Sequence, residues 1–159
     1  MKDLVDVYKE YEKVKPHIQA ELRSKSEKHS SYETVLSKDS TVGKVVEKNT
    51  YTINDKTFYF DHYSIHLTPS VMKIARGMYL KLARIIHPDK CSNPILKRLF
   101  PIAHEYYTKK EIAGLLSVCI RASIDISVTD QDFIRIVTQQ YTRTKKELLT
   151  YHTIQTNGQ

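Results

Sequence analysis

The sequence predicts a mainly α-helical protein, in which a central antiparallel helix pair is preceded by a β-hairpin and followed by two further helices. Three observations support this prediction. Apolar residues recur at helical spacing along most of the chain, a stretch with period two interrupts them between residues 42 and 60, and prolines or capping residues mark the helix ends. With 159 residues and 40% hydrophobic content, the chain can build one domain with an ordinary core and an extension.

The first 23 residues are predicted to form one amphipathic helix, or two short helices that meet at Pro16. Apolar residues fall at helical intervals among charged ones, at Leu4, Val7, Tyr8, Tyr11, Val14, Ile18 and Leu22. Such a helix can pack on its own domain, or it can serve as an arm for partner binding or self-association. Residues 24–41 are rich in Ser, Lys, Glu and Thr, so residues 1–41 are expected to be a helical arm and a polar linker.

Residues 42–60 are predicted to form the β-hairpin. Apolar and aromatic residues alternate there with Thr and Lys, and Asn54 and Asp55 provide a tight turn. The turn would set residues 51–53 opposite residues 57–59. This hairpin is expected to cover the apolar face of the helix that follows it.

A helix is predicted from Pro69 to Ile86, because Thr68 is a good N-cap and Pro88 disfavours the helical conformation at the residue before it. One face of this helix is apolar, with Val71, Ala75, Met78, Tyr79, Leu82, Ile85 and Ile86. The opposite face carries no acidic residue and four basic ones, Lys73, Arg76, Lys81 and Arg84. Solvated faces usually mix charge signs, so this basic face predicts an acidic partner surface; a merely solvated lysine-rich face is the alternative.

Residues 79–90, with the sequence YLKLARIIHPDK, resemble the second helix and following loop of the J-domain (DnaJ) co-chaperone family. The family's usual form is Tyr-x-Lys-Leu-Ala-x-x-x-His-Pro-Asp-Lys. Leu99, Ile102 and Tyr106 fall at the offsets of the family's third helix, with Leu99 in place of the usual aromatic residue. Pro101 requires that this helix start near Phe100, or that it follow a short turn. The family's first helix has only a weak counterpart in residues 62–67, so the resemblance covers residues 62–107.

The resemblance implies a co-chaperone that docks on a DnaK-type heat-shock ATPase and stimulates its ATP hydrolysis. The docking residues would be the basic face and the loop of His87, Pro88, Asp89 and Lys90. Pro88 would fix the loop backbone, Asp89 would accept hydrogen bonds from an arginine, and His87 would orient the loop.

Two other interpretations are open. A divergent J-like structural or interaction module, as viral proteins carry, would bind an assembly or nucleic acid without stimulating the ATPase. In the simplest interpretation, Pro88 merely ends a helix and Asp89 caps the next turn.

Two more helices are predicted after the J-like pair. Residues 108–111 have the form of a capping box for a helix over residues 109–120, whose nearly all-round apolar surface predicts burial against the Pro69–Ile86 helix. Thr129 or Asp130 is expected to cap a last helix. Residues 42–152 would thus be the J-like domain with its hairpin and C-terminal helices, and residues 153–159 a frayed tail.

The sequence predicts neither an enzyme nor a cofactor or metal site. Its four glycines form no phosphate-binding loop, and no Cys or His grouping completes a zinc-ligand spacing. The net charge of +7 and the pI near 9.3 indicate acidic partners, either a protein surface, nucleic acid or an anionic membrane. No apolar run is long enough to cross a bilayer. Two cysteines, Cys91 and Cys119, and the lack of a signal peptide predict a reducing, cytoplasmic location.

Overall fold

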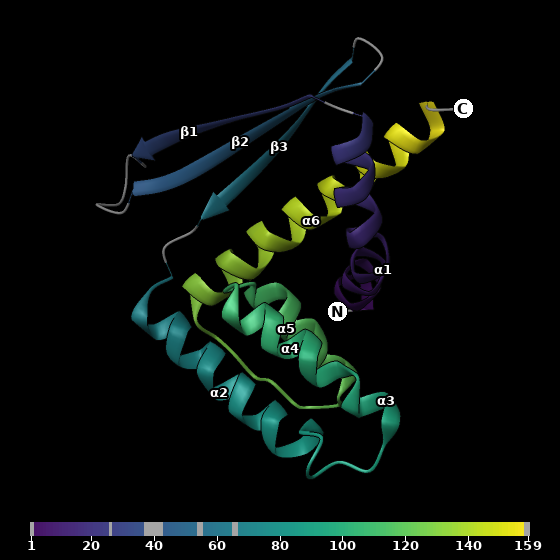
Figure 1. Cartoon of the computed structure of the whole chain (residues 1–159). Helices are drawn as coiled ribbons and strands as arrows, with labels where there is room; N and C mark the ends of the chain where they lie inside the picture. The colour runs from purple at the N-terminus through teal and green to yellow at the C-terminus, as the bar shows by residue number, and fades with distance from the viewer. Residues whose placement is uncertain (1, 26, 37–42, 54–55, 65–66, 158–159) are drawn as a thin grey trace. The chain divides into compact units, whose positions relative to one another are not determined.

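The computed structural model describes residues 2–25, 27–36, 43–53, 56–64 and 67–157 (Figure 1). The elements in these residues are, in chain order, α1 (Lys2–Lys25), β1 (Glu27–Leu36), β2 (Gly43–Ile53), β3 (Lys56–Ser64), α2 (Pro69–Ile86), α3 (Pro94–Lys97), α4 (Leu99–Thr108), α5 (Ile112–Arg121) and α6 (Gln131–Asn157). The predicted mainly α class is confirmed.

The chain divides into two compact units. One comprises Met1–Glu10 and Leu67–Lys145, and is called the helical unit below. The other comprises Tyr11–His66 and Lys146–Gln159, and is called the sheet unit. The helical unit is therefore made of two chain segments, and the strands lie between them in the sequence.

The sheet unit contains an antiparallel sheet with the strand order β1-β2-β3. The central strand β2 pairs with β1 from Thr52–Glu27 to Gly43–Leu36, and with β3 from Val45–Ser64 to Ile53–Lys56.

The predicted added β-hairpin was wrong as an isolated two-stranded unit, and the predicted polar linker over residues 24–41 was also wrong. Residues 27–36 of that linker form β1, which pairs with β2 and makes a three-stranded sheet. A lone two-stranded hairpin is marginal in water, and a third strand satisfies the second edge of β2. The weak counterpart of the family's first helix is also not helical, since residues 62–64 lie in β3.

Helix α1 is one helix that continues through Pro16, as the first of the two alternatives for this segment predicted. Proline removes one backbone hydrogen bond but does not end the helix. Within the helical unit, the side chains of Leu4 and Tyr8 are buried, so the start of α1 packs on its own unit. Among the described residues, no helix is long and apolar enough to span a membrane.

The core of the helical unit is formed where α2, α4 and α5 meet. Helix α2 contacts both α4 and α5, and α4 also contacts α5. Helices α2 and α4 run in opposite directions, joined by a loop and the short helix α3 (Figure 1). Every residue of α5 from Ile112 to Cys119 is buried, which confirms that this all-round apolar helix packs into the core against α2. Ile85 was wrongly assigned to the core face of α2, because 46% of it is exposed.

Two of the predicted helix boundaries are confirmed. The Thr68 hydroxyl accepts a hydrogen bond from the backbone N–H of Val71 at 3.3 Å at the start of α2. The Asp130 carboxylate accepts one from the N–H of Phe133 at 3.0 Å at the start of α6. Pro101 lies in the first turn of α4, where its missing N–H leaves no helical bond unmade.

The capping box over residues 108–111 was wrong. The Thr108 hydroxyl donates instead to the carbonyl of His104 at 2.8 Å, and Lys110 adopts a left-handed conformation with φ of 59°. Glu111 makes no cap bond, because its carboxylate is bonded to Tyr8 and Arg143. Helix α5 therefore begins at Ile112.

The frayed tail from residue 153 was also wrong over most of its length, because α6 continues to Asn157. Tyr151 and Ile154 are buried near its end, and burial of apolar surface stabilises a helix that its polar composition alone would not.

Candidate docking site at the end of α2

The four residues after α2 form a tight turn. The N–H of His87 donates to the carbonyl of Ala83 at 3.3 Å, which completes the last turn of the helix. The N–H groups of Lys90 and Cys91 both donate to the carbonyl of His87, each at 2.9 Å. Pro88 and Asp89 are consequently at the tip of the turn, and the side chain of Asp89 is 87% exposed.

His87 connects this turn to the rest of the helical unit. Its Nδ1 accepts a hydrogen bond from the backbone N–H of Asp89 at 3.2 Å, so the neutral ring carries its proton on Nε2. The ring also meets the edge of Phe100 in α4, with 4.9 Å between the centroids. The Asp89 carboxylate lies 3.7 Å from Nδ1 and forms an ion pair when His87 is protonated. The histidine thus holds the turn from inside and leaves the aspartate facing outward.

An aromatic cluster joins α2 to α4 beside this turn. It consists of Tyr79 from α2 and of Phe100, His104 and Tyr107 from α4. The ring of Tyr79 stacks on that of Tyr107 with centroids 4.5 Å apart, and its hydroxyl forms a 3.0 Å hydrogen bond with Nδ1 of His104. Because Phe100 belongs both to this cluster and to the contact with His87, the cluster fixes the turn relative to α4.

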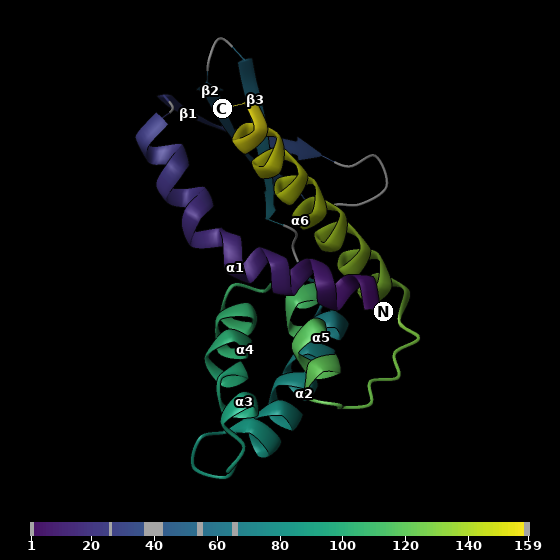
Figure 2. The same cartoon turned by 90° about the vertical axis from the view of Figure 1, so that its right-hand side faces the viewer.

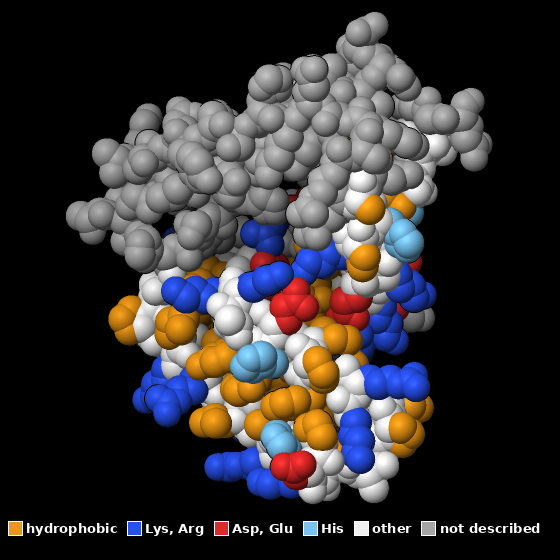
Figure 3. Space-filling model, in the orientation of Figure 1, with side chains coloured by type: hydrophobic (Ala, Val, Ile, Leu, Met, Phe, Trp, Pro, Cys, Tyr) orange, Lys and Arg blue, Asp and Glu red, His pale blue; other side chains and the backbone are white. Residues whose placement is uncertain are grey.

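This cluster was not predicted from the sequence, although its spacing carries a signal. Phe100, His104 and Tyr107 are spaced by four and three residues, which places them on one face of a helix. Figure 3 shows hydrophobic and histidine side chains gathered over α2 and α4 on the viewed face of the helical unit.

The basic face of α2 is exposed along its whole length. All four of its side chains, Lys73, Arg76, Lys81 and Arg84, are exposed, as is Lys90 in the turn. Leu80 lies among them and is 46% exposed. Figure 3 shows basic side chains along the outer edge of α2. The predicted docking residues are therefore all accessible on one helix and the turn that follows it. A surface of this charge attracts carboxylates or phosphates.

The two cysteines are both free thiols with different surroundings. Cys91 is partly exposed just after the turn. Cys119 is fully buried in α5, and this burial raises the pKa of its thiol to about 12, against a smaller opposing effect of Lys81. The Cys119 thiol is therefore protonated and unreactive at neutral pH. In the described part of the chain, no group of three or more His, Cys, Asp or Glu residues is placed to hold a metal ion.

Comparison with family models, with curated proteins and with solved structures found no match for this chain.

Proposed function

We propose that this protein is a J-domain-like co-chaperone, which docks on a DnaK-type heat-shock ATPase through His87, Pro88, Asp89, Lys90 and the basic face of α2. The observation that supports the proposal most directly is the outward-facing Asp89 carboxylate at the end of α2. It follows the helix at the family's spacing, and its turn is held by His87 and Phe100. A reducing compartment is part of the proposal and is consistent with two free thiols.

The chemistry of the turn supports a docking role. An exposed carboxylate can accept two hydrogen bonds from one arginine of a partner, and charge-assisted bonds of this kind are about twice as strong as neutral ones. The basic face of α2 would meet an acidic surface and raise the rate of association. The protein itself would perform no chemistry; it would change the rate of a reaction in its partner.

The proposal is tested by single-turnover ATP hydrolysis in a DnaK-type chaperone, with and without the full-length protein. We expect the wild-type protein to stimulate hydrolysis and Asp89→Asn to abolish the stimulation. Asp6→Asn is the matched control, because Asp6 is also exposed but lies outside the docking residues. Both substitutions should change stability by less than about 0.5 kcal/mol, since both side chains are exposed. Equal stimulation by wild type and Asp89→Asn would contradict the proposal.

A second candidate function is an interaction module that uses the J-like helices only as architecture and binds nucleic acid. Strand β3 in the place of the family's first helix favours it, because the helix pair then lacks the helix that precedes it in the family. Reversal of Lys73, Arg76, Lys81 and Arg84 to glutamate separates the candidates. If this module is correct, wild type binds single or duplex strands with a steep salt dependence, the reversed variant does not, and neither stimulates the ATPase.

A further inference from the structure

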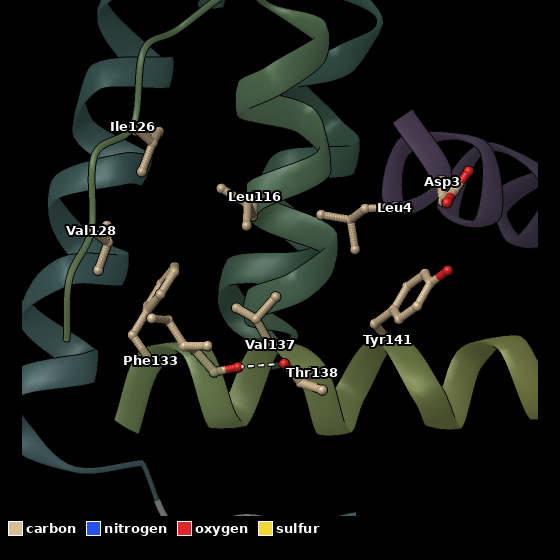
Figure 4. Close-up of a pocket in the computed structure, with 10 residues that line it drawn as sticks. Asp3, Leu4, Leu116, Ile126, Val128, Phe133, Val137, Thr138 and Tyr141 are labelled. Atoms are coloured by element: carbon tan, nitrogen blue, oxygen red, sulfur yellow. Dashed lines mark hydrogen bonds between the residues drawn. The ribbon is translucent and has the colours of Figure 1, made fainter. Parts of the chain in front are cut away.

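A cavity of about 480 Å³ lies in the helical unit and shares no residue with the docking site. Its wall is built by α1, α5, α6 and the segment that connects α5 to α6 (Figure 4). The apolar side chains that converge on it include Leu4, Leu116, Ile126, Val128, Phe133 and Val137. A volume of this size is typical of ligand-binding pockets and exceeds the voids of a well-packed core.

Few polar side chains line this cavity, and the charge among them is negative. Asp3 is the only charged residue among those that line the cavity, and its side chain is exposed. The hydroxyl of Thr138 donates its hydrogen to the carbonyl of Ile134 at 2.8 Å, so it has no hydrogen left to donate to an occupant. An apolar cavity with the Asp3 carboxylate at its edge favours an occupant that is apolar and carries a cation.

The connecting segment at residues 124–130 forms one side of the cavity in an extended conformation (Figure 2). Its exposure alternates strictly: residues 124, 126 and 128 are half-buried, whereas residues 125, 127 and 129 are exposed. This is the side-chain pattern of a β-strand. Within the described part of the chain, the backbone N–H and C=O groups of residues 125–129 make no hydrogen bond. The segment therefore offers an unpaired strand edge next to an apolar cavity.

We propose that this cavity and its connecting segment bind an extended apolar peptide segment of another protein, with a lysine or arginine next to the apolar side chains. The peptide backbone pairs with residues 125–129 as an added strand, which satisfies groups that the chain itself leaves unpaired. Every second side chain of the peptide then enters the cavity beside Ile126 and Val128, and the cationic side chain meets Asp3. A backbone edge selects a peptide over a small amphiphile, because only a peptide supplies regularly spaced donors and acceptors.

This site is independent of the proposed ATPase docking. Incompletely folded proteins expose apolar segments of this kind, so in a co-chaperone the occupant would be the client. Peptide binding without ATPase stimulation would support this inference and contradict the proposed function. ATPase stimulation without peptide binding would support the proposed function and contradict this inference.

Fluorescence anisotropy with the full-length protein tests the site. The probe is a short labelled peptide in which leucine alternates with serine and a lysine stands two positions before the first leucine, so that it shares the face of the leucines. One comparison peptide has glutamate in place of the lysine, and another is N-methylated at alternate amides on the edge that would pair. We expect saturable binding of the lysine peptide, with the glutamate peptide about two- to fivefold weaker, as for an exposed ion pair. The N-methylated peptide should bind at least about tenfold more weakly, because strand pairing is lost.

Two variants and a control locate the site. Asp3→Lys should reverse the preference between the lysine and glutamate peptides, which a purely structural role of Asp3 would not do. Ile134→Ser should weaken binding about tenfold through lost apolar contact, without unfolding the protein, because Ile134 is 45% exposed. Leu149→Ser removes an exposed apolar side chain from the same helix outside the cavity, and binding should not change.

Three results would overturn the inference. They are the absence of saturable binding, equal losses in Ile134→Ser and Leu149→Ser, and displacement of the peptide by dodecylamine with no effect of N-methylation. The last result would mean that the cavity takes small cationic amphiphiles.

Discussion

The Glu111 carboxylate accepts hydrogen bonds from Tyr8, 103 residues earlier in the chain, and from Arg143, 32 residues later. The distances are 2.9 Å to the Tyr8 hydroxyl and 2.5 Å to the Arg143 guanidinium. The hydroxyl of Thr144 donates in turn to that of Tyr8 at 3.3 Å. At the scale of single residues, this half-buried carboxylate joins the start of α1 to α6 through the start of α5.

Removing the Tyr8 hydroxyl should destabilise the protein. Tyr8→Phe keeps the ring that meets Tyr106 edge-on, but it takes a donor from Glu111 and an acceptor from Thr144. We expect a loss of about 1–3 kcal/mol in the free energy of unfolding, measured by urea denaturation. Tyr141→Phe is the control, since its hydroxyl makes no hydrogen bond in the described part of the chain, and it should change stability by less than about 0.5 kcal/mol. Equal effects would mean that the network contributes nothing.

Alkaline pH should destabilise the fold through Cys119 and Tyr8. Burial raises the pKa of the Cys119 thiol to about 12, and burial assisted by the Glu111 carboxylate raises the pKa of Tyr8 well above its usual value. In the unfolded chain these groups lose their protons near pH 8.5 and 10, while the folded chain keeps them. The unfolded state then binds fewer protons, so stability falls as pH rises, by up to about 1.4 kcal/mol per pH unit for each group.

This pH dependence is measured as urea midpoints from about pH 7 to about pH 11. The fall should begin near pH 9 because of Cys119, and it should steepen above about pH 10 because of Tyr8. Cys119→Ala should remove the first part of the slope and Tyr8→Phe the second. An identical slope in both variants and in wild type would assign it to other groups.

At the scale of helices and strands, two glycines in helices have opposite roles. A Cβ atom added at Gly114 in α5 would lie 2.6 Å from the ring of Tyr106, so α4 and α5 approach closely only because this residue has no side chain. A Cβ added at Gly77 in α2 would meet nothing within 4 Å. The helix propensity of glycine is the same at both positions, and only the space around it differs.

Gly77→Ala and Gly114→Ala form a matched pair of substitutions. The first should stabilise the protein by about 0.5–1 kcal/mol, because alanine loses less conformational entropy in a helix. The second should destabilise it by about 1–3 kcal/mol, because the buried Tyr106 ring must move. Thermal melts followed by circular dichroism measure both. Stabilisation by Gly114→Ala would show that α4 and α5 can separate without cost.

Local sequence patterns predicted which segments are helical better than they predicted where the helices end or how many strands the sheet has. Thr68 and Asp130 were predicted because a cap depends on residues three positions apart. The spacing of residues 108–111 assigned Glu111 to a capping box. That assignment was wrong because the partners of Glu111, Tyr8 and Arg143, are distant in the sequence. Residues 27–36 were assigned to a linker because their composition is polar, whereas backbone pairing with β2 decides their structure.

At the scale of the whole molecule, the proposed docking residues follow from a local motif, whereas the contacts that support their turn could not be predicted from the sequence. The turn at His87 and Asp89 follows a motif that is continuous in the sequence. Its attachment through Phe100 depends on how α2 packs against α4. The cavity depends on Leu4, Leu116 and Val137, from three segments that only the tertiary fold brings together. The predicted boundary at residue 42 also differs from the helical unit, which takes its first segment from Met1–Glu10.

The C-terminal helices should be required for the J-like helix pair to fold. Leu115 in α5 is fully buried, so Leu115→Ala should cost about 2–5 kcal/mol and lower the melting temperature of the helical unit in one transition. Leu149→Ala is the control, because Leu149 is 68% exposed, and it should change stability by less than about 0.5 kcal/mol. A fragment of residues 67–107 that melts cooperatively and stimulates the ATPase would show instead that the helix pair is independent.

The bonds of Tyr8 also determine when this protein can fold during its synthesis. Its partner Thr144 is added 136 residues later, which at about 5–20 residues per second takes on the order of ten seconds. During that interval α1 and α2 leave the ribosome before the helices that bury them exist. The core of the helical unit is therefore complete only when α6 has emerged, while the sheet between Glu10 and Leu67, whose described strands pair with their neighbours in the sequence, can form earlier.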